Sequence, residues 1–136
     1  MFFKNTTDNT KDLVKVAALL IHAAKIDENL TNQEEKIIKT ALLENGVKDK
    51  DLEKVFKDGI KLEEDANQIL EFTKEVKNMD YENKIKIVKT LWKIIYSNKE
   101  ADIYETSLMR KLSGLLYIDD KIMGKIKEEI KKENSI

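Results

Sequence analysis

The residues best suited to chemistry in this chain are carboxylates gathered in two short polar turns. Asp27 and Glu34 belong to the first turn, and Glu100, Asp102 and Glu105 belong to the second. Hard cations such as Ca²⁺ and Mg²⁺ prefer oxygen ligands of this kind. If the two turns meet in space, these five carboxylates converge on one divalent cation. A metal site built from both turns is therefore one hypothesis that the sequence suggests.

The same carboxylates also have the spacing of helix caps. Thr31-x-x-Glu34 is a capping box, and Asp102-x-x-Glu105 is its close relative. A cap of this kind stabilises its helix by about 1 kcal/mol. The EF-hand template fails in both turns, because neither has the glycine or the final bidentate glutamate at the required spacing. Two interpretations stay open: the carboxylates hold a cation, or they only cap helices.

Helices must position both turns. Apolar residues recur three and four positions apart along most of the chain, and strict alternation is rare. The 136 residues include no proline and four glycines, so helix breakers are scarce. The pattern predicts an all-α fold of about seven helices in one compact bundle. The first expected helix is capped at Asn9 or Thr10 and ends near Ala24, and the second is Thr31–Gly46, with a left-handed glycine at its end. The third covers 49–57 and stops near Gly59. The remaining helices are Leu62–Lys77, Asp80–Tyr96 and two more that begin at Asp102 and at Asp119 or Asp120.

Two segments of the chain are alike, each a helix, an acidic turn and a second helix. A shift of 71 residues sets Leu20 on Leu91 and Glu34 on Glu105. Apolar and capping roles agree along both segments, so we expect two similar units packed around a shared core. The helix before the second turn has the broadest apolar surface, which indicates a central, nearly buried helix.

Composition excludes several classes of function. The 25 basic and 26 acidic residues nearly cancel, whereas a nucleic-acid-binding protein usually has a basic excess. The absence of cysteine excludes disulfides and thiolate zinc sites. The longest apolar run, Val16–Ile21, is too short to span a bilayer, and the first residues lack the apolar stretch of a secretory signal. We expect a cytoplasmic protein with a single domain over residues 1–136, frayed at 1–8 and 131–136.

No catalytic motif stands out. His22 is the single histidine, and a lone histidine in an apolar helix is more often a hydrogen-bonded structural residue than a general base. The serines have no nucleophile elbow around them, and neither a phosphate-binding glycine loop nor a zinc-protease motif is found. The sequence therefore predicts that the protein is not an enzyme. A catalytic interpretation would need a polar cleft that brings His22 beside carboxylates.

The chain resembles the tellurite-resistance TerB family in two segments, AAKIDENLTNQEEKII and LWKIIYSNKEADIYETSLMRKLSGLLYIDDKI. It is also similar to the TerB-like domain at the front of a membrane-anchored DnaJ-type co-chaperone. The resemblance covers about Leu13 to Ile130 and implies a single all-helical TerB-like domain. Turns in this family run Ala-Asp-Gly followed by an acidic residue, and the resemblance implies that they form a metal site.

The two turns keep the family pattern to different degrees. In the first turn Asp27 and Glu34 match, and a glutamate replaces the glycine. In the second turn Glu100, Asp102 and Glu105 match, but an asparagine and a lysine replace the Asp-Gly pair. The first turn is therefore the better place for a cation.

The resemblance implies a non-catalytic binding or scaffolding domain in the response to tellurite or general chemical stress, dependent on a divalent cation, Ca²⁺ or Mg²⁺. The partners that it implies are proteins, including a membrane-associated complex or a second copy of the chain in a homodimer. Nucleic acid and a small-molecule substrate are not among them. The alternative is a metal-independent protein-interaction or dimerisation module whose acidic turns only cap helices.

Overall fold

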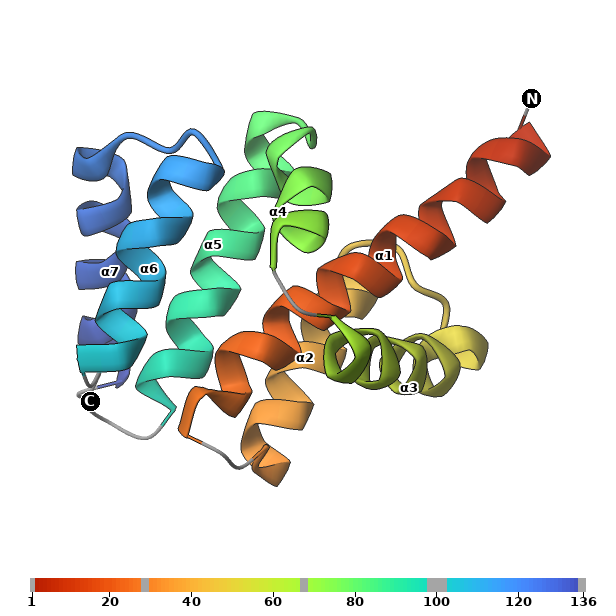
Figure 1. The fold of residues 1–136 in the computed structure, drawn as a ribbon, viewed down its shortest axis with the longest axis horizontal. Coiled ribbons are helices and arrows are strands. Elements are labelled where there is room, and N and C mark those ends of the chain that lie inside the picture. The colour runs from red at the N-terminus through yellow and green to blue at the C-terminus, as the bar shows by residue number, and fades with distance from the viewer. Residues whose placement is uncertain (1, 28–29, 67–68, 98–102, 135–136) are drawn as a thin grey trace.

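The computed structural model describes residues 2–27, 30–66, 69–97 and 103–134. Within these ranges every regular element is a helix, which confirms the all-α bundle (Figure 1). The elements are α1 (Phe2–Ala24), the short 3-10 helix η1 (Lys25–Asp27), α2 (Asn32–Glu44), α3 (Asp49–Asp65), α4 (Leu70–Lys77), α5 (Tyr81–Tyr96), α6 (Ile103–Leu115) and α7 (Asp120–Asn134). No helix of the described part is both long and apolar enough to cross a membrane.

The second half of α1 forms the centre of the core. Each residue from Val16 to Ile21 is fully buried, so the helix has neighbours on every side. Helices α2, α3, α4 and α5 all pack against it, α3 most extensively. A helix segment that is apolar all round is stable in water only when other elements cover it completely. In Figure 1, α1 runs diagonally through the molecule, and its N-terminal end projects on the side opposite α7.

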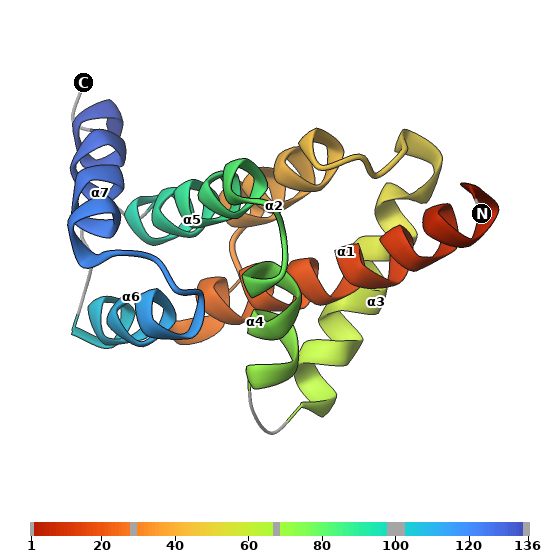
Figure 2. The ribbon, with the colours of Figure 1, turned by 90° about the horizontal axis from the view of Figure 1, so that it is seen from above.

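Helix α5 is the second central helix, as its broad apolar surface predicts. It packs against α1, α2, α4 and α7, and Figure 2 shows α2 and α5 side by side. Two buried polar groups tie it to the last third of the chain. Trp92 Nε1 donates to Met123 Sδ of α7 at 3.3 Å, and Lys84 Nζ donates to the Leu116 carbonyl just after α6 at 2.9 Å. The ammonium group thereby satisfies a helix-end carbonyl that lacks an intrahelical partner.

Several expected helix boundaries are wrong. Helix α3 does not stop near Gly59 but continues to Asp65, and α4 begins at Leu70 rather than at Leu62. Helix α1 begins at Phe2, so Asn9 and Thr10 lie inside it and do not cap it. The expectation for Gly46 is confirmed, since this residue follows α2 with φ of 104°.

Gly59 has a packing role in the middle of α3. A Cβ atom built there would lie 2.8 Å from Ala17 Cβ and 3.2 Å from Ile21 Cδ1 of α1. Atoms that are not bonded cannot approach so closely, so glycine is what lets α3 lie against the fully buried stretch of α1. Gly59 is therefore not a helix stop, and its contact with α1 gives the reason for a glycine at this position.

We predict that Gly59→Ala lowers the free energy of unfolding by about 1–3 kcal/mol, the usual cost of overpacking a tight core. Urea unfolding followed by circular dichroism measures this change. The matched control is Gly124→Ala in α7, where a Cβ meets nothing within 4 Å. There the better helix propensity of alanine should raise stability by up to about 1 kcal/mol. Equal effects at the two positions would contradict the packing role of Gly59.

Candidate functional site

The helix ends that flank the two acidic turns lie at one end of the molecule. Figure 1 shows the end of α1 and the start of α2 at the bottom of the view, together with the end of α5 and the start of α6. A site shared by both turns requires this arrangement. Turns at opposite ends of the domain would have excluded it.

Glu34 forms the capping box that the sequence predicts. The Thr31 amide donates to Glu34 Oε1 at 2.9 Å, and the Glu34 amide donates to Thr31 Oγ1 at 3.1 Å. Glu34 is 1% exposed, so its carboxylate is held in this position at the start of α2. One of its oxygens is therefore already bonded to the backbone of the same turn.

Glu105 occupies the corresponding place in the second turn. It is the third residue of α6, as Glu34 is the third residue of α2, and it too is buried. Glu105 lies close enough to Tyr96 to change the pKa of the tyrosine hydroxyl. Burial raises the pKa of the Tyr96 hydroxyl, and the negative charges of Glu128 and Glu105 raise it further.

The five-carboxylate metal site stays a prediction. The side chain of Asp27 and the whole of Glu100 and Asp102 lie outside the described residues. Among the residues that are described, no group of three or more histidine, aspartate or glutamate side chains is arranged to hold a metal ion. Glu34 and Glu105 are thus the two predicted ligands whose placement is known.

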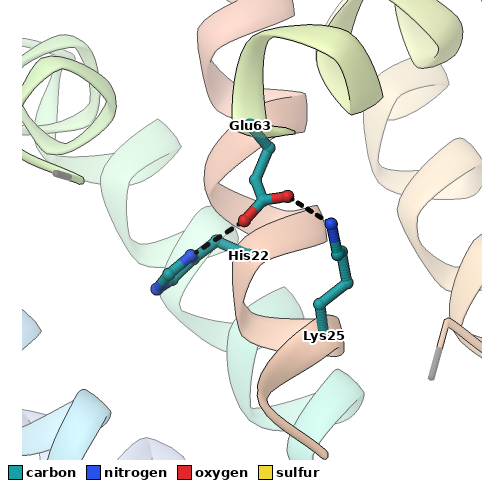
Figure 3. A network of polar contacts seen from close by, with 3 residues as sticks. All are labelled: His22, Lys25 and Glu63. Atoms are coloured by element: carbon teal, nitrogen blue, oxygen red, sulfur yellow. Dashed lines mark hydrogen bonds and ion pairs between the residues drawn. The ribbon is translucent and has the colours of Figure 1, made fainter. Parts of the chain in front are cut away.

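A polar network that the sequence did not predict joins α1 and η1 to the end of α3 (Figure 3). Glu63 Oε1 accepts from Lys25 Nζ at 2.7 Å. Its other oxygen, Oε2, lies 3.2 Å from His22 Nδ1. The Glu63 side chain is 12% exposed, and those of His22 and Lys25 are about one third exposed. One carboxylate therefore bridges two basic groups at the edge of the core.

Electrostatics determine which atom of this network donates. Burial by itself raises the pKa of the Glu63 carboxyl, but the hydrogen bonds and charges of Lys25 and His22 outweigh it, and the net pKa lies below its usual value. The hydrogen bond to Glu63 in turn raises the pKa of Lys25. An ionised carboxylate can only accept hydrogen bonds. His22 Nδ1 must therefore carry the proton in their contact, which leaves Nε2 for another partner.

The His22–Glu63 pair is the carboxylate contact that a catalytic interpretation of His22 would need. A carboxylate that accepts from one ring nitrogen fixes the tautomer and orientation of a histidine for work at the other nitrogen. Glu63 is 41 residues from His22 and 38 from Lys25, and no local pattern connects residues so far apart. The only indication in the sequence is the apolar face of α3, because such a face must be covered by another helix, here α1.

The described helices pack around the buried stretch of α1 and around α5, so the chain is a small all-helical bundle. A family model described as tellurite resistance protein TerB matches residues 13–128. The chain therefore belongs to the TerB family, as the resemblance of its two segments implies. No curated protein and no solved structure matches it significantly.

We predict that Glu63→Gln lowers the free energy of unfolding at pH 7 by about 1–2 kcal/mol, because it removes charge-assisted hydrogen bonds. The folded-state pKa of Glu63 is lowered from 4.5, so its contribution is present above that value and is lost as pH falls through the folded pKa. The difference between wild type and variant should therefore shrink below pH 4.5. Urea unfolding between pH 7 and pH 3 measures it, with Glu71→Gln on the exposed face of α4 as control. A difference that is constant with pH would contradict the network.

Proposed function

We propose that this chain is a non-catalytic binding or scaffolding domain of the tellurite-resistance, stress-response type, and that it acts on protein partners in the cytoplasm. Membership of the TerB family supports the type of function. The buried polar side chains of the described part are used in internal hydrogen bonds. Every buried side-chain nitrogen and oxygen of the described part has a hydrogen-bond partner. Thr73 and Ser113, for example, donate to carbonyls of their own helices.

The observation that carries this proposal is the conformation of Tyr117. This tyrosine follows α6 with φ of 56° and is 72% exposed. The Ile118 amide donates to the Ser113 carbonyl and the Tyr117 amide to the Gly114 carbonyl, which is the Schellman pattern. Glycine is usual at this position, because a side chain in the left-handed region costs about 1–2 kcal/mol.

The ring of Tyr117 is also held in place. Lys77 Nζ lies 4.5 Å from its centroid, within the range of a cation–π interaction. Tyrosine is enriched at protein interfaces and among the residues that dominate their affinity. A residue that binds a partner needs a side chain that is exposed and held in one orientation. Tyr117 meets both conditions, although glycine would cost less free energy at its position. We therefore propose the α6–α7 turn as the partner surface.

The test is capture of partners by tagged wild-type chain and by Tyr117→Gly, from the native organism grown with and without tellurite. We expect Tyr117→Gly to remain within about 1 kcal/mol of wild-type stability, because relief of backbone strain offsets the lost cation–π contact. It should nevertheless lose the captured protein. Tyr104→Ala is the matched control, since Tyr104 is equally exposed but lies at the start of α6.

Two results would contradict this proposal. One is equal capture by wild type and Tyr117→Gly. The other is capture of no protein above the untagged control under tellurite stress. A captured second copy of the chain or a membrane-associated complex would identify the partner without changing the role of Tyr117.

A divalent cation at the end that bears the acidic turns is the second candidate function. It is favoured by the common location of the four flanking helix ends in Figure 1 and by the buried carboxylates of Glu34 and Glu105 at matching helix positions. Oxygen ligands of this kind suit Ca²⁺ or Mg²⁺. A cation bound by both turns would fix the relative orientation of the two helical units.

Calorimetric titration with Ca²⁺, Mg²⁺ and Mn²⁺ tests this candidate. If a cation binds, heat is released or absorbed, the melting temperature rises with its concentration, and Asp27→Asn abolishes both effects. The control is Thr31→Ala, which should cost about 1 kcal/mol by removing the capping box but leave the titration unchanged. The absence of heat and of any shift in melting temperature would contradict metal binding and leave the carboxylates as caps.

A further inference from the structure

We propose that the outer face of α6 binds an acidic helix of a partner protein, and that Arg110 pairs with a carboxylate of that helix. The contact surface is the α6 stripe, which consists of Ser107, Arg110, Gly114 and Tyr117 and is exposed along its whole length. This inference rests on the proposed function, because Tyr117 belongs to both. It adds the class of partner and the way in which the partner binds.

The α6 stripe has the spacing of a helix-binding seam. Its residues follow one another at intervals of three, four and three positions, which is how the contact positions of two-stranded coiled coils repeat. Residues at such intervals share one side of a helix, so a second helix laid along α6 would run over the stripe toward the ring of Tyr117. Tyr104 lies outside the stripe, because it precedes Ser107 by three positions where the alternation requires four.

Gly114 lets a second helix come close to α6. Its φ is not positive, unlike that of Gly46, so the backbone does not require glycine there. A Cβ built on Gly114 meets nothing within 4 Å, so no neighbour in the fold requires glycine either. Glycine is among the least favourable residues in a helix, and close approach of another molecule to the backbone is a reason to keep it. Ser107 lies two helical turns earlier and is also small, so the middle of the stripe is low.

Arg110 gives the stripe its charge. It is the only arginine of the chain, and it is exposed and forms no ion pair within the described residues. Lys111 beside it adds a second exposed positive charge, whereas the one carboxylate of α6, that of Glu105, is buried. A guanidinium group binds a carboxylate through two parallel hydrogen bonds, and arginine and tyrosine often dominate the affinity of interfaces. The stripe is therefore complementary to an acidic partner.

The aspartates that follow the stripe are already used at the start of α7. Asp119 Oδ1 accepts from the Lys121 amide at 2.8 Å, and Asp120 Oδ1 accepts from Ser113 Oγ at 3.2 Å. The positive end of the helix macrodipole favours negative charge at this place. These two carboxylates thus have local partners, and the positive charge of α6 stays available.

A second copy of the chain fits this surface less well than an acidic helix does. In a symmetric dimer the two copies contact each other through the same residues. Two α6 helices packed through the centre of the stripe would bring the Arg110 and Lys111 cations of both copies together. Like charges that face each other across an interface are strongly unfavourable. A helix with carboxylates along its contact side meets no such conflict.

The test uses a synthetic helical peptide of three Leu-Ala-Glu-Leu-Ala-Glu-Glu repeats, titrated into the full chain and followed by amide chemical shifts in ¹H–¹⁵N spectra. We expect saturable shifts at Ser107 and Gly114. Arg110→Glu should weaken peptide binding at least about tenfold through loss of a charge-assisted contact. Lys57→Glu, the same type of charge reversal at an exposed position on α3, is the matched control and should bind like wild type. A peptide with glutamine in place of every glutamate should bind at least about tenfold more weakly.

A second pair of variants tests the close approach without destabilising the fold. Gly114→Leu should raise the melting temperature, because leucine has a much better helix propensity and the space above the glycine is open. It should nevertheless weaken peptide binding at least about tenfold, because the new side chain occupies the place of the peptide. Gly124→Leu in α7, where a Cβ also meets nothing within 4 Å, should likewise raise the melting temperature but leave peptide binding unchanged.

Several results would overturn this inference. They are the absence of saturable shifts at the α6 stripe, wild-type affinity in Arg110→Glu or in Gly114→Leu, and equal affinity for the acidic and the glutamine peptide. A dimer in sedimentation experiments that Gly114→Leu dissociates would assign the stripe to a second copy and would also overturn it. Each of these results leaves the partner surface at Tyr117 in place, whereas failure of the proposed function shows as equal capture by wild type and Tyr117→Gly.

Discussion

Complete burial of one stretch of α1 is the constraint on which the rest of this structure depends. Val16 to Ile21 have no exposed surface, and each large apolar side chain among them contributes about 1.5–3 kcal/mol when fully buried. That gain requires α3 to approach α1 closely, which Gly59 permits. Glu63 lies one helical turn beyond Gly59, and His22 lies directly after the buried stretch. The packing of two apolar surfaces therefore brings an acid and a base from distant parts of the chain into contact.

The candidate functional features are arranged around this core on different sides of the molecule. Helix ends with buried carboxylates lie at one end, and the exposed Tyr117 lies at the α6–α7 turn. The α6 stripe lies between them, on the outer face of α6. Helix α6 is common to all three, because it begins with the turn that contains Glu105, carries the stripe and ends at Tyr117. A ligand or partner that moved α6 would thus affect every one of these sites.

Local features of this chain could be predicted from the sequence, whereas features that depend on contacts between helices could not. The spacing of Thr31 and Glu34 predicts the capping box because both residues belong to one turn of chain. The broad apolar surface of α5 likewise predicts its burial. Gly59 was misread as a helix stop, since only its contact with α1 gives it a different role. Glu63 was missed for the same reason. The shared cation site depends on how two turns meet, so sequence alone predicts its ligands but not their convergence.

The most direct test of this account is the tautomer of His22. It is the single histidine of the chain, so its signals in a long-range ¹H–¹⁵N spectrum need no assignment by mutation. If α1 and α3 pack as described, Glu63 accepts from His22 Nδ1, and the neutral ring should carry its proton on Nδ1 with Nε2 unprotonated. A neutral ring protonated on Nε2 would mean that the carboxylate does not hold His22. It would contradict the network of His22, Lys25 and Glu63.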